Sequence, residues 1–379
     1  MSKPLSYIDN LIFGNKTSSH NLQIDSLDGL RGVAVLFVLL SHTSNAGIRL
    51  PFLNFSGSGK YGVYLFFVLS SFLLTLPFLN KKEDELGSAG LWRSYAVKRF
   101  LRIYPLYATV LLFHYLFTAA AGTTEIAFPF APADLIKHLT LLEGKDLFWT
   151  IPVEFKYYFI LPFVVLFMVR ALGGRVWLAA ASVIAATAAI RLIVPRLPEG
   201  AVDYLQFIPY MPIFLFGSFA AVAHSRLSGM RLPAGVKTVL ELIAIGLMLG
   251  VWVVMPLGRS VLTADQVTQT HGFSKSFLIF GGLWMVFVIA YLHGAGYVKR
   301  FLSWKPMRLI GMISFSVYLW HLPVVKAVDT YVNAGSAIKM LVILTVTFAV
   351  SFSSYLIIER PMSRAGLRKK QPRASVAAS

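Results

Sequence analysis

The chain contains the stretch Asp25-Ser-Leu-Asp-Gly-Leu-Arg-Gly-Val-Ala-Val-Leu-Phe-Val-Leu-Leu-Ser-His42, which begins polar and turns apolar at Leu30. Arg31 and His42 are eleven residues apart. A helix returns them to within roughly 20° of the same face, about 16 Å apart along its axis. If this helix crosses a bilayer, Arg31 lies near one surface and His42 near the middle. An ionisable residue at that depth indicates a functional site.

The composition is that of an integral membrane protein. Of the 379 residues, 56% are hydrophobic and 14% are charged, whereas about a quarter of the residues of a soluble protein are charged. The apolar residues occur in runs of about 20, the length that a membrane helix needs. We therefore expect an all-α, polytopic integral membrane protein with about ten transmembrane helices. The expected spans are 30–48, 60–80, 103–121, 147–169, 176–194, 206–224, 238–257, 276–297, 309–328 and 338–358.

The positive charge indicates topology rather than a nucleic-acid partner. The formal net charge is +18, which in a soluble protein would suggest nucleic-acid binding. With a cytoplasmic N-terminus, lysine and arginine favour the cytoplasmic loops by more than two to one. The positive-inside rule then places both termini in the cytoplasm. We expect a polar cytoplasmic lead-in over 1–24, a membrane domain over 25–361, a basic cytoplasmic tail over 362–379, and no nucleic-acid partner.

Several kinds of chemistry are excluded by absent residues. The sequence has no cysteine, which removes disulfides, thiolate–zinc sites and a cysteine nucleophile. Glycine-rich phosphate loops, metal-spaced His/Cys clusters and a Gly-x-Ser-x-Gly elbow are also absent. We expect no bound metal and no permanently bound cofactor.

Polar residues of several predicted spans fall near the bilayer centre. They are His42, His114, Glu154, His321 and the pair Ser70-Ser71. An isolated charge at this depth costs several kcal/mol, so such groups are expected to face one another or a polar cavity. Each also has a structural interpretation. His42 can be a neutral histidine bonded across helices, Glu154 can pair with Lys156 or an arginine, and His321 can anchor packing.

Arg99 and Arg102 are three residues apart, so a helix presents both on one face. Positive-inside residues need no further role. Two guanidinium groups on one face, beside the end of a transmembrane span, can however bind phosphates through paired hydrogen bonds.

Six motifs follow one another along the chain. They are Leu27-Asp-Gly-Leu-Arg-Gly-x-Ala…His42, Phe66-Phe-Val-Leu-Ser-Ser, Arg99-x-x-Arg102-Ile-x-Pro, Trp149-x-x-x-x-Glu154…Tyr158…Pro162, Ser316-x-Tyr318-Leu-Trp-His321 and Glu359-Arg-Pro. In this order and spacing they resemble the acyltransferase-3 family of bacterial membrane O-acyltransferases, over residues 25–361. The sequence departs at Ser70-Ser71, where the family usually has Ser-Gly.

The resemblance implies transfer of an acyl group to a hydroxyl of a carbohydrate, a surface polysaccharide precursor or a related glycosylated metabolite, at the bacterial inner membrane. The donor is expected to be acyl-CoA, usually acetyl-CoA, as a co-substrate. By the same resemblance, Arg31 and His42 correspond to the family's Arg-then-His pair, and Arg99 and Arg102 to its paired arginines.

These observations suggest a mechanism. Arg31, Arg99 and Arg102 bind the donor, and His42 acts as general base or forms a transient acyl-histidine. Glu154 or a nearby carboxylate orients the imidazole, and Ser70 or Ser71 donates to the oxyanion. Trp149, Tyr318 and His321 are expected to support the site. The alternative is a secondary transporter or flippase for a lipid-linked sugar, although the paired inverted repeats of many transporters are not evident.

Overall fold

The structure is a computed structural model and describes residues 22–49, 54–122, 124–193, 207–254 and 277–366. All regular secondary structure in these residues is helical, as the sequence predicts. The α-helices are α2 (Leu22–Asn45), α3 (Gly59–Leu79), α4 (Glu83–Leu86), α5 (Ala89–Ala121), α6 (Pro132–Leu139), α7 (Thr150–Leu166), α8 (Val176–Ile193), α9 (Phe207–Ser228), α10 (Ala234–Val254), α12 (Phe277–His293), α13 (Tyr297–Leu302), α14 (Lys305–Met312), α15 (Ser314–Tyr331), α16 (Ser336–Ser354) and α17 (Arg360–Ala365). Shorter turns are the 3₁₀-helix η1 (Asp146–Trp149) and the π-helices η2 (Phe167–Ala171) and η3 (Tyr355–Glu359).

Seven helices among the described residues are long and apolar enough to cross a bilayer. An eighth span results if α14 and α15, which meet at 76°, are taken as one broken span. Two of the predicted spans, 176–194 and 276–297, correspond to the shorter apolar helices Val176–Leu192 and Phe277–His293. The arrangement is that of a multi-pass membrane protein.

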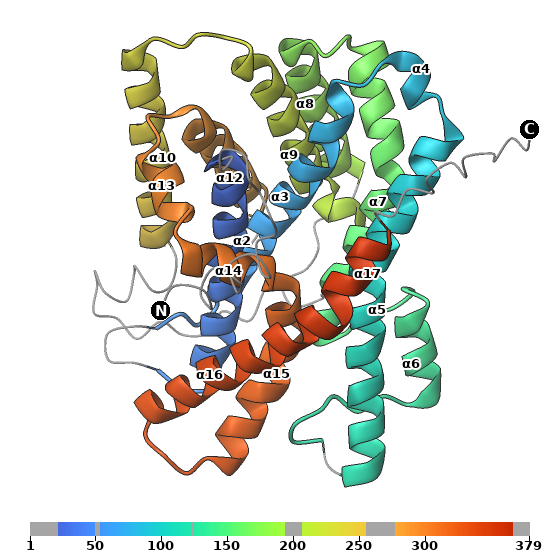
Figure 1. The fold of residues 1–379 in the computed structure, drawn as a ribbon, viewed down its shortest axis with the longest axis vertical. Helices are drawn as coiled ribbons and strands as arrows, with labels where there is room; N and C mark the ends of the chain where they lie inside the picture. The colour runs from blue at the N-terminus through green and yellow to red at the C-terminus, as the bar shows by residue number, and fades with distance from the viewer. Residues whose placement is uncertain (1–21, 50–53, 123, 194–206, 255–276, 367–379) are drawn as a thin grey trace, which may run out of the picture.

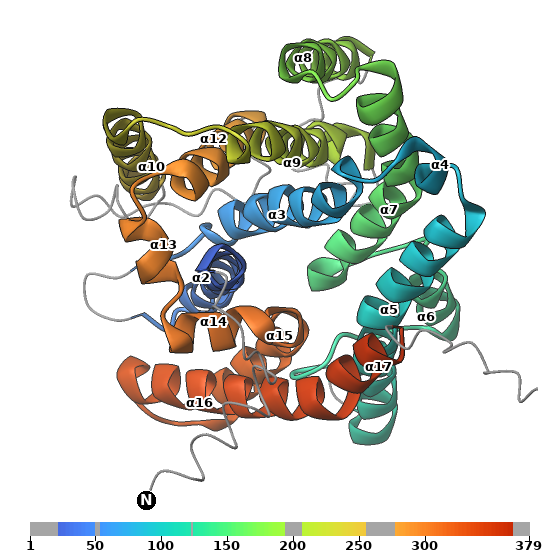
Figure 2. The same cartoon turned by 45° about the horizontal axis from the view of Figure 1, so that its top comes forward.

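Helix α2 lies at the centre of the molecule, with α3, α13, α14 and α15 packed around it (Figures 1 and 2). Helix α3 in turn packs against α7, α9 and α12. Helices α8 and α10 lie at the periphery, and α10 carries exposed Val239, Leu242 and Leu249. Such apolar surface is suited to contact with lipid.

The first half of α2 touches neighbouring backbone directly. A Cβ atom added at Gly29 would lie 1.8 Å from the carbonyl oxygen of Leu302, and one added at Gly311 would lie 1.7 Å from that of Asp28. A Cβ atom added at Gly32 would lie 2.5 Å from a carbonyl oxygen of α14. Small residues permit such close approach of membrane helices. The glycines of the opening stretch therefore fix how α2 meets α13 and α14.

Helix α2 begins eight residues before the predicted span because its polar start is buried against protein. Asp25 is buried and forms an ion pair of 2.6 Å with Arg308 of α14. Hydropathy alone places the start of the span after the aspartates. The ion pair allows the helix to begin before them.

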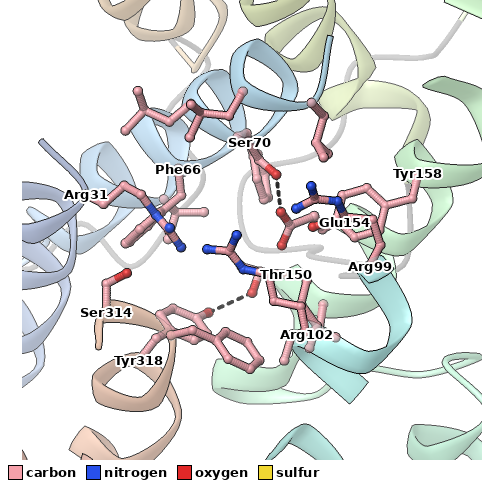
Figure 3. A pocket seen from close by; sticks show the side chains of 18 residues that line it. Arg31, Phe66, Ser70, Arg99, Arg102, Thr150, Glu154, Tyr158, Ser314 and Tyr318 are labelled. Carbon is pink, nitrogen blue, oxygen red and sulfur yellow. Dashed lines mark hydrogen bonds between the residues drawn. The ribbon is translucent and has the colours of Figure 1, made fainter. Parts of the chain in front are cut away.

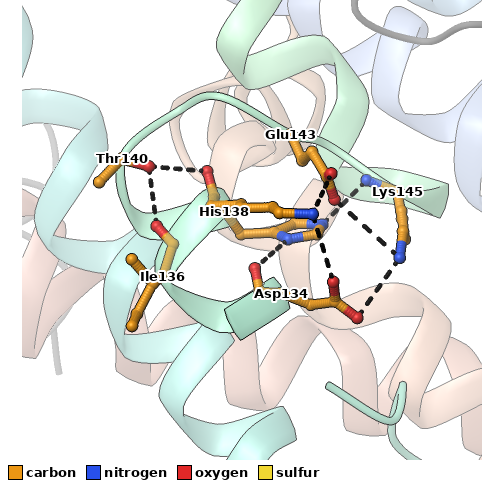
Figure 4. Close-up of polar contacts among 7 residues, drawn as sticks. Asp134, Ile136, His138, Thr140, Glu143 and Lys145 are labelled. Carbon is orange, nitrogen blue, oxygen red and sulfur yellow. Dashed lines mark hydrogen bonds and ion pairs between the residues drawn. The ribbon is translucent and has the colours of Figure 1, made fainter. Parts of the chain in front are cut away.

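One short helix lies between the predicted spans 103–121 and 147–169. His138 of this helix, α6, is buried, and its Nδ1–H donates to the carbonyl of Asp134 at 2.7 Å. Its Nε2 accepts the backbone N–H of Lys145 at 3.0 Å (Figure 4). Burial lowers the pKa of His138, which agrees with this neutral, doubly bonded ring. The Tyr107 hydroxyl donates to the His138 carbonyl at 2.9 Å and attaches α6 to α5.

We expect Gly311→Ala to destabilise the protein by about 1–3 kcal/mol, the usual cost of overpacking. The added methyl group meets rigid backbone, which cannot move aside as a side chain can. The measurement is thermal unfolding of detergent-purified protein. Gly246→Ala in α10 is the matched control, because a Cβ there meets nothing within 4 Å. Equal unfolding temperatures for the two variants would contradict the close packing of α2 and α14.

Candidate active site

A cavity of about 100 Å³ lies between α2, α3, α5, α7 and α15 (Figure 3). Its wall combines apolar side chains with a concentration of polar ones. The polar lining residues are Arg31, Ser70, Arg99, Arg102, Thr150, Glu154, Tyr158, Ser314 and Tyr318. The cavity thus gathers six of the residues that the sequence predicts for the site, namely Arg31, Ser70, Arg99, Arg102, Glu154 and Tyr318.

Helical spacing explains how α7 and α15 contribute to the wall. Thr150, Glu154 and Tyr158 are four residues apart and line one face of α7, and Ser314 and Tyr318 do the same on α15. The two faces are joined because the Thr150 hydroxyl donates to the Tyr318 hydroxyl at 3.0 Å. Tyr318 donates onward to the carbonyl of Leu147 at 2.7 Å.

The three arginines of the cavity have no direct anionic partner in the part of the chain that the structure describes. None of Arg31, Arg99 and Arg102 makes a hydrogen bond or ion pair with a residue that the structure describes. The Nε atom of Arg99 is buried without a partner. Asp28, Glu154 and Glu359 interact with these arginines only at longer range. Figure 3 shows the guanidinium groups directed toward the interior of the cavity. This arrangement suits an anionic ligand, because guanidinium groups bind phosphates and carboxylates through paired hydrogen bonds.

Two adjacent serines have different surroundings. The Ser70 hydroxyl donates to the carboxylate of Glu154 inside the cavity. The Ser71 hydroxyl is fully buried and donates to carbonyls of its own helix, at 2.9 Å to Phe67 and 3.1 Å to Val68. The structure therefore places Ser70 in the site and directs Ser71 into the packing of α3.

His42 lies outside the lining of the cavity, in a second group of rings. Its ring centroid is 5.1 Å from that of His321, which is itself 5.9 Å from the ring of Tyr318. Tyr318 therefore belongs to both groups. Glu154 makes no described contact with His42, so the structure does not place it where the predicted orienting role requires it. Trp149 also lies outside the lining and packs edge-on against Phe67.

Four further residues belong to this region and were not assigned to the site from the sequence. Thr150 and Tyr158 flank Glu154 at the i ± 4 spacing, which was a usable signal. Ser314 has no comparable signal. Glu359 is 4% exposed and accepts a hydrogen bond from the Ser316 hydroxyl at 2.9 Å. It belongs to the motif Glu359-Arg-Pro, but only the tertiary structure brings it near the arginines.

Comparison with known proteins agrees with this architecture. The family model described as "Acyltransferase domain" matches residues 24–356. The chain belongs to the acyltransferase-3 family. The match covers all five helices of the cavity and both histidines of the second group.

Relatives of this acyltransferase-3 chain are similar over most of its length. It is 26% identical to the putative peptidoglycan O-acetyltransferase YrhL of Bacillus subtilis, over 93% of this chain and 56% of the relative. It is 24% identical to the O-acetyltransferase OatA of Staphylococcus aureus, over 91% of this chain and 58% of the relative. It is 25% identical to the peptidoglycan O-acetyltransferase OatA of Listeria monocytogenes, over 90% and 56%. The chain thus spans little more than half the length of these relatives. No solved structure matches it.

We expect inorganic pyrophosphate to stabilise the protein against heat through the three arginines. A ligand at a hundredfold excess over its dissociation constant adds about 2.7 kcal/mol. Arg99→Gln with Arg102→Gln should remove this stabilisation, and lysine at both positions should restore only part of it, because lysine lacks the planar fork. The measurement is thermal unfolding with pyrophosphate against chloride at equal ionic strength.

Arg93→Gln is the matched control, since Arg93 is an exposed arginine on the same helix. Undiminished stabilisation in the Arg99/Arg102 variant would show that these arginines do not bind the anion.

Proposed function

We propose that this protein is a membrane O-acyltransferase that moves an acetyl group from acetyl-CoA to a hydroxyl of a carbohydrate. The observation that carries the proposal is the cavity in which three arginines meet without an ion-pair partner among the described residues. Coenzyme A carries several phosphate charges that such a cavity can hold. The names of the relatives support acetyl as the transferred group and a peptidoglycan-like carbohydrate as acceptor.

In this proposal the donor enters through the arginine cavity. Arg99 and Arg102 project from one face of α5, with Arg31 opposite them on α2. They hold the phosphates while the flexible arm of the donor extends along α2. His42 is eleven residues beyond Arg31 on the same helix, about 16 Å away along its axis. The flexible arm of the donor therefore extends from the arginine cavity to His42.

His42 acts as the general base. It takes the proton of the acceptor hydroxyl while the hydroxyl oxygen bonds to the thioester carbonyl carbon. Collapse of the tetrahedral adduct breaks the carbon–sulfur bond, and the thiolate of coenzyme A receives the proton from His42. The products are the acetyl ester and free coenzyme A. A transient acyl-histidine is the variant of this route.

Glu154 has a different role in this proposal from the one predicted from the sequence. It accepts the Ser70 hydroxyl and lies in the field of Arg31 and Arg99. A carboxylate there offsets part of the positive charge while the donor is absent. Because Ser70 is bonded to this carboxylate and Ser71 to its own helix, we assign neither serine to the oxyanion.

We also propose that both termini and the donor side are cytoplasmic, as the positive-inside rule predicts. Reporter fusions at Glu85 and Ser228 should report the cytoplasm, and fusions at Ser56 and Thr124 the outside. Fusions at Ser19 and Arg368 should also report the cytoplasm, and one at Gln266 the outside; these three positions lie outside the described residues. An external Glu85 would place the paired arginines on the wrong side for a cytoplasmic donor.

The proposed reaction is tested with detergent-purified protein, acetyl-CoA and muropeptides from digested peptidoglycan. Coenzyme A release and the acetylated muropeptide should appear together without a membrane potential. His42→Gln should lower kcat by about a hundredfold or more, because an amide cannot accept the proton. A transporter or flippase would instead give no acetylated product, and family membership favours the transferase.

His114→Asn serves as the control. His114 Nδ1 accepts the backbone N–H of Phe128 at 3.0 Å outside the cavity, and the asparagine oxygen can replace it. The activity of the His114→Asn protein should stay near that of the wild type. Near-normal turnover of folded His42→Gln protein would contradict the assignment of His42 as the general base.

A further inference from the structure

His321 is held in one orientation and one tautomer. Its Nδ1 lies 2.7 Å from the carbonyl oxygen of Tyr318 and 3.2 Å from that of Val317, both on its own helix. A carbonyl oxygen can only accept, so Nδ1 carries the proton and donates it. The other ring nitrogen, Nε2, is then the acceptor of the neutral ring.

This acceptor has no partner within the described part of the chain. The His321 side chain is fully buried, and its Nε2 makes no hydrogen bond there. Buried polar atoms are almost always paired, so an orphaned one indicates a missing partner. Since a carbonyl fixes the tautomer, that partner must be a hydrogen-bond donor.

The ring of His42 lies next to the ring of His321. The two ring centroids are 5.1 Å apart at an interplanar angle of 51°. The protein contains a second histidine pair for comparison. His224 and His293 have centroids 4.8 Å apart at 44°, and their nitrogens form a hydrogen bond of 2.9 Å. The rings of His42 and His321 are thus almost as close as those of a histidine pair that is hydrogen-bonded in this protein.

We propose that His321 is the positioning residue of His42, with the His42 N–H donating to His321 Nε2. The proposal rests on the proposed function and deepens it. It replaces the predicted role of Glu154, which lies in the cavity and is bonded to Ser70. The bond leaves the second nitrogen of His42 with its lone pair directed away from His321 and available for the acceptor hydroxyl.

The proton balance of the reaction is unchanged by this bond. When His42 takes the acceptor's proton, its other N–H remains bonded to His321 Nε2, which supports the imidazolium. The proton taken from the acceptor then passes to the departing thiolate. His321 gains and loses no proton, so its role is to fix the tautomer and orientation of His42.

Two substitutions separate this role from a structural one. The amide of asparagine reaches the position of Nδ1, and that of glutamine reaches the position of Nε2. His321→Asn therefore keeps the bond to the Tyr318 carbonyl and loses the acceptor, whereas His321→Gln keeps the acceptor. We expect His321→Gln to retain kcat within about tenfold of wild type and His321→Asn to lose about a hundredfold. The KM for acetyl-CoA should stay unchanged in both.

If His321 only anchors its own helix, the order reverses and His321→Asn is the more active variant. That reversal, or equal activity of the two variants, overturns the proposal. His114→Asn is the matched control, because it makes the same change at another buried histidine that uses Nδ1. In a His42→Gln background, His321→Asn should cause no further loss, because the two act as one unit.

If either variant fails to fold, ¹⁵N NMR of the wild-type protein labelled at histidine decides. A coupling between the His42 N–H and His321 Nε2 supports the proposal, and an unbonded Nε2 signal overturns it. Failure of the proposed function is distinguishable, because it appears as absent acetyl transfer by the wild-type protein in the same assay.

Discussion

The close contact of α2 with the backbone of α13 and α14 determines most of the site. It depends on Gly29, Gly32 and Gly311, where no side chain can be accommodated without displacing backbone. The ion pair of Asp25 and Arg308 adds a specific, buried contact at the same place. A buried ion pair contributes little net stability but is costly to break. Together these contacts set the rotation of α2, and that rotation decides where Arg31 and His42 point.

The electrostatics of the cavity follow from this arrangement. Three guanidinium groups in a low-dielectric region repel one another, and the carboxylates of Asp28, Glu154 and Glu359 act on them only at longer range. None of the three arginines has an ion-pair partner among the described residues. An anionic ligand that pairs with these arginines would therefore stabilise the folded helix bundle. The ring of His321 contacts Tyr318, and the rings of His42 and His321 both lie outside the lining of the cavity.

The packing of α3 shows how the chain accommodates its departure from the family pattern. The family usually has glycine where this chain has Ser71. The Ser71 hydroxyl donates a hydrogen bond to a carbonyl of its own helix. The space is provided from the opposite side, because a Cβ at Gly217 of α9 would lie 2.0 Å from the Ser71 hydroxyl and 2.2 Å from the Val68 carbonyl. Thr75 and Ser218, one turn further on, join the helices through a hydrogen bond of 2.7 Å. The close approach of the two helices is thus retained although the glycine lies on the other helix.

Some properties of this protein follow from the sequence alone, because they depend on local periodicity. Hydropathy and apolar run length determined the all-helical membrane class, and helical spacing determined that Arg99 and Arg102 share a face. The motifs determined the family. Partners across helices were not predictable in this way: Glu154 bonds Ser70 rather than contacting His42, and His42 meets His321. The bend of 76° between α14 and α15, and the short helix α6, were also decided by tertiary contacts. The physical reason is that a sequence fixes which residues share a helix face, whereas packing between helices fixes the direction in which that face points.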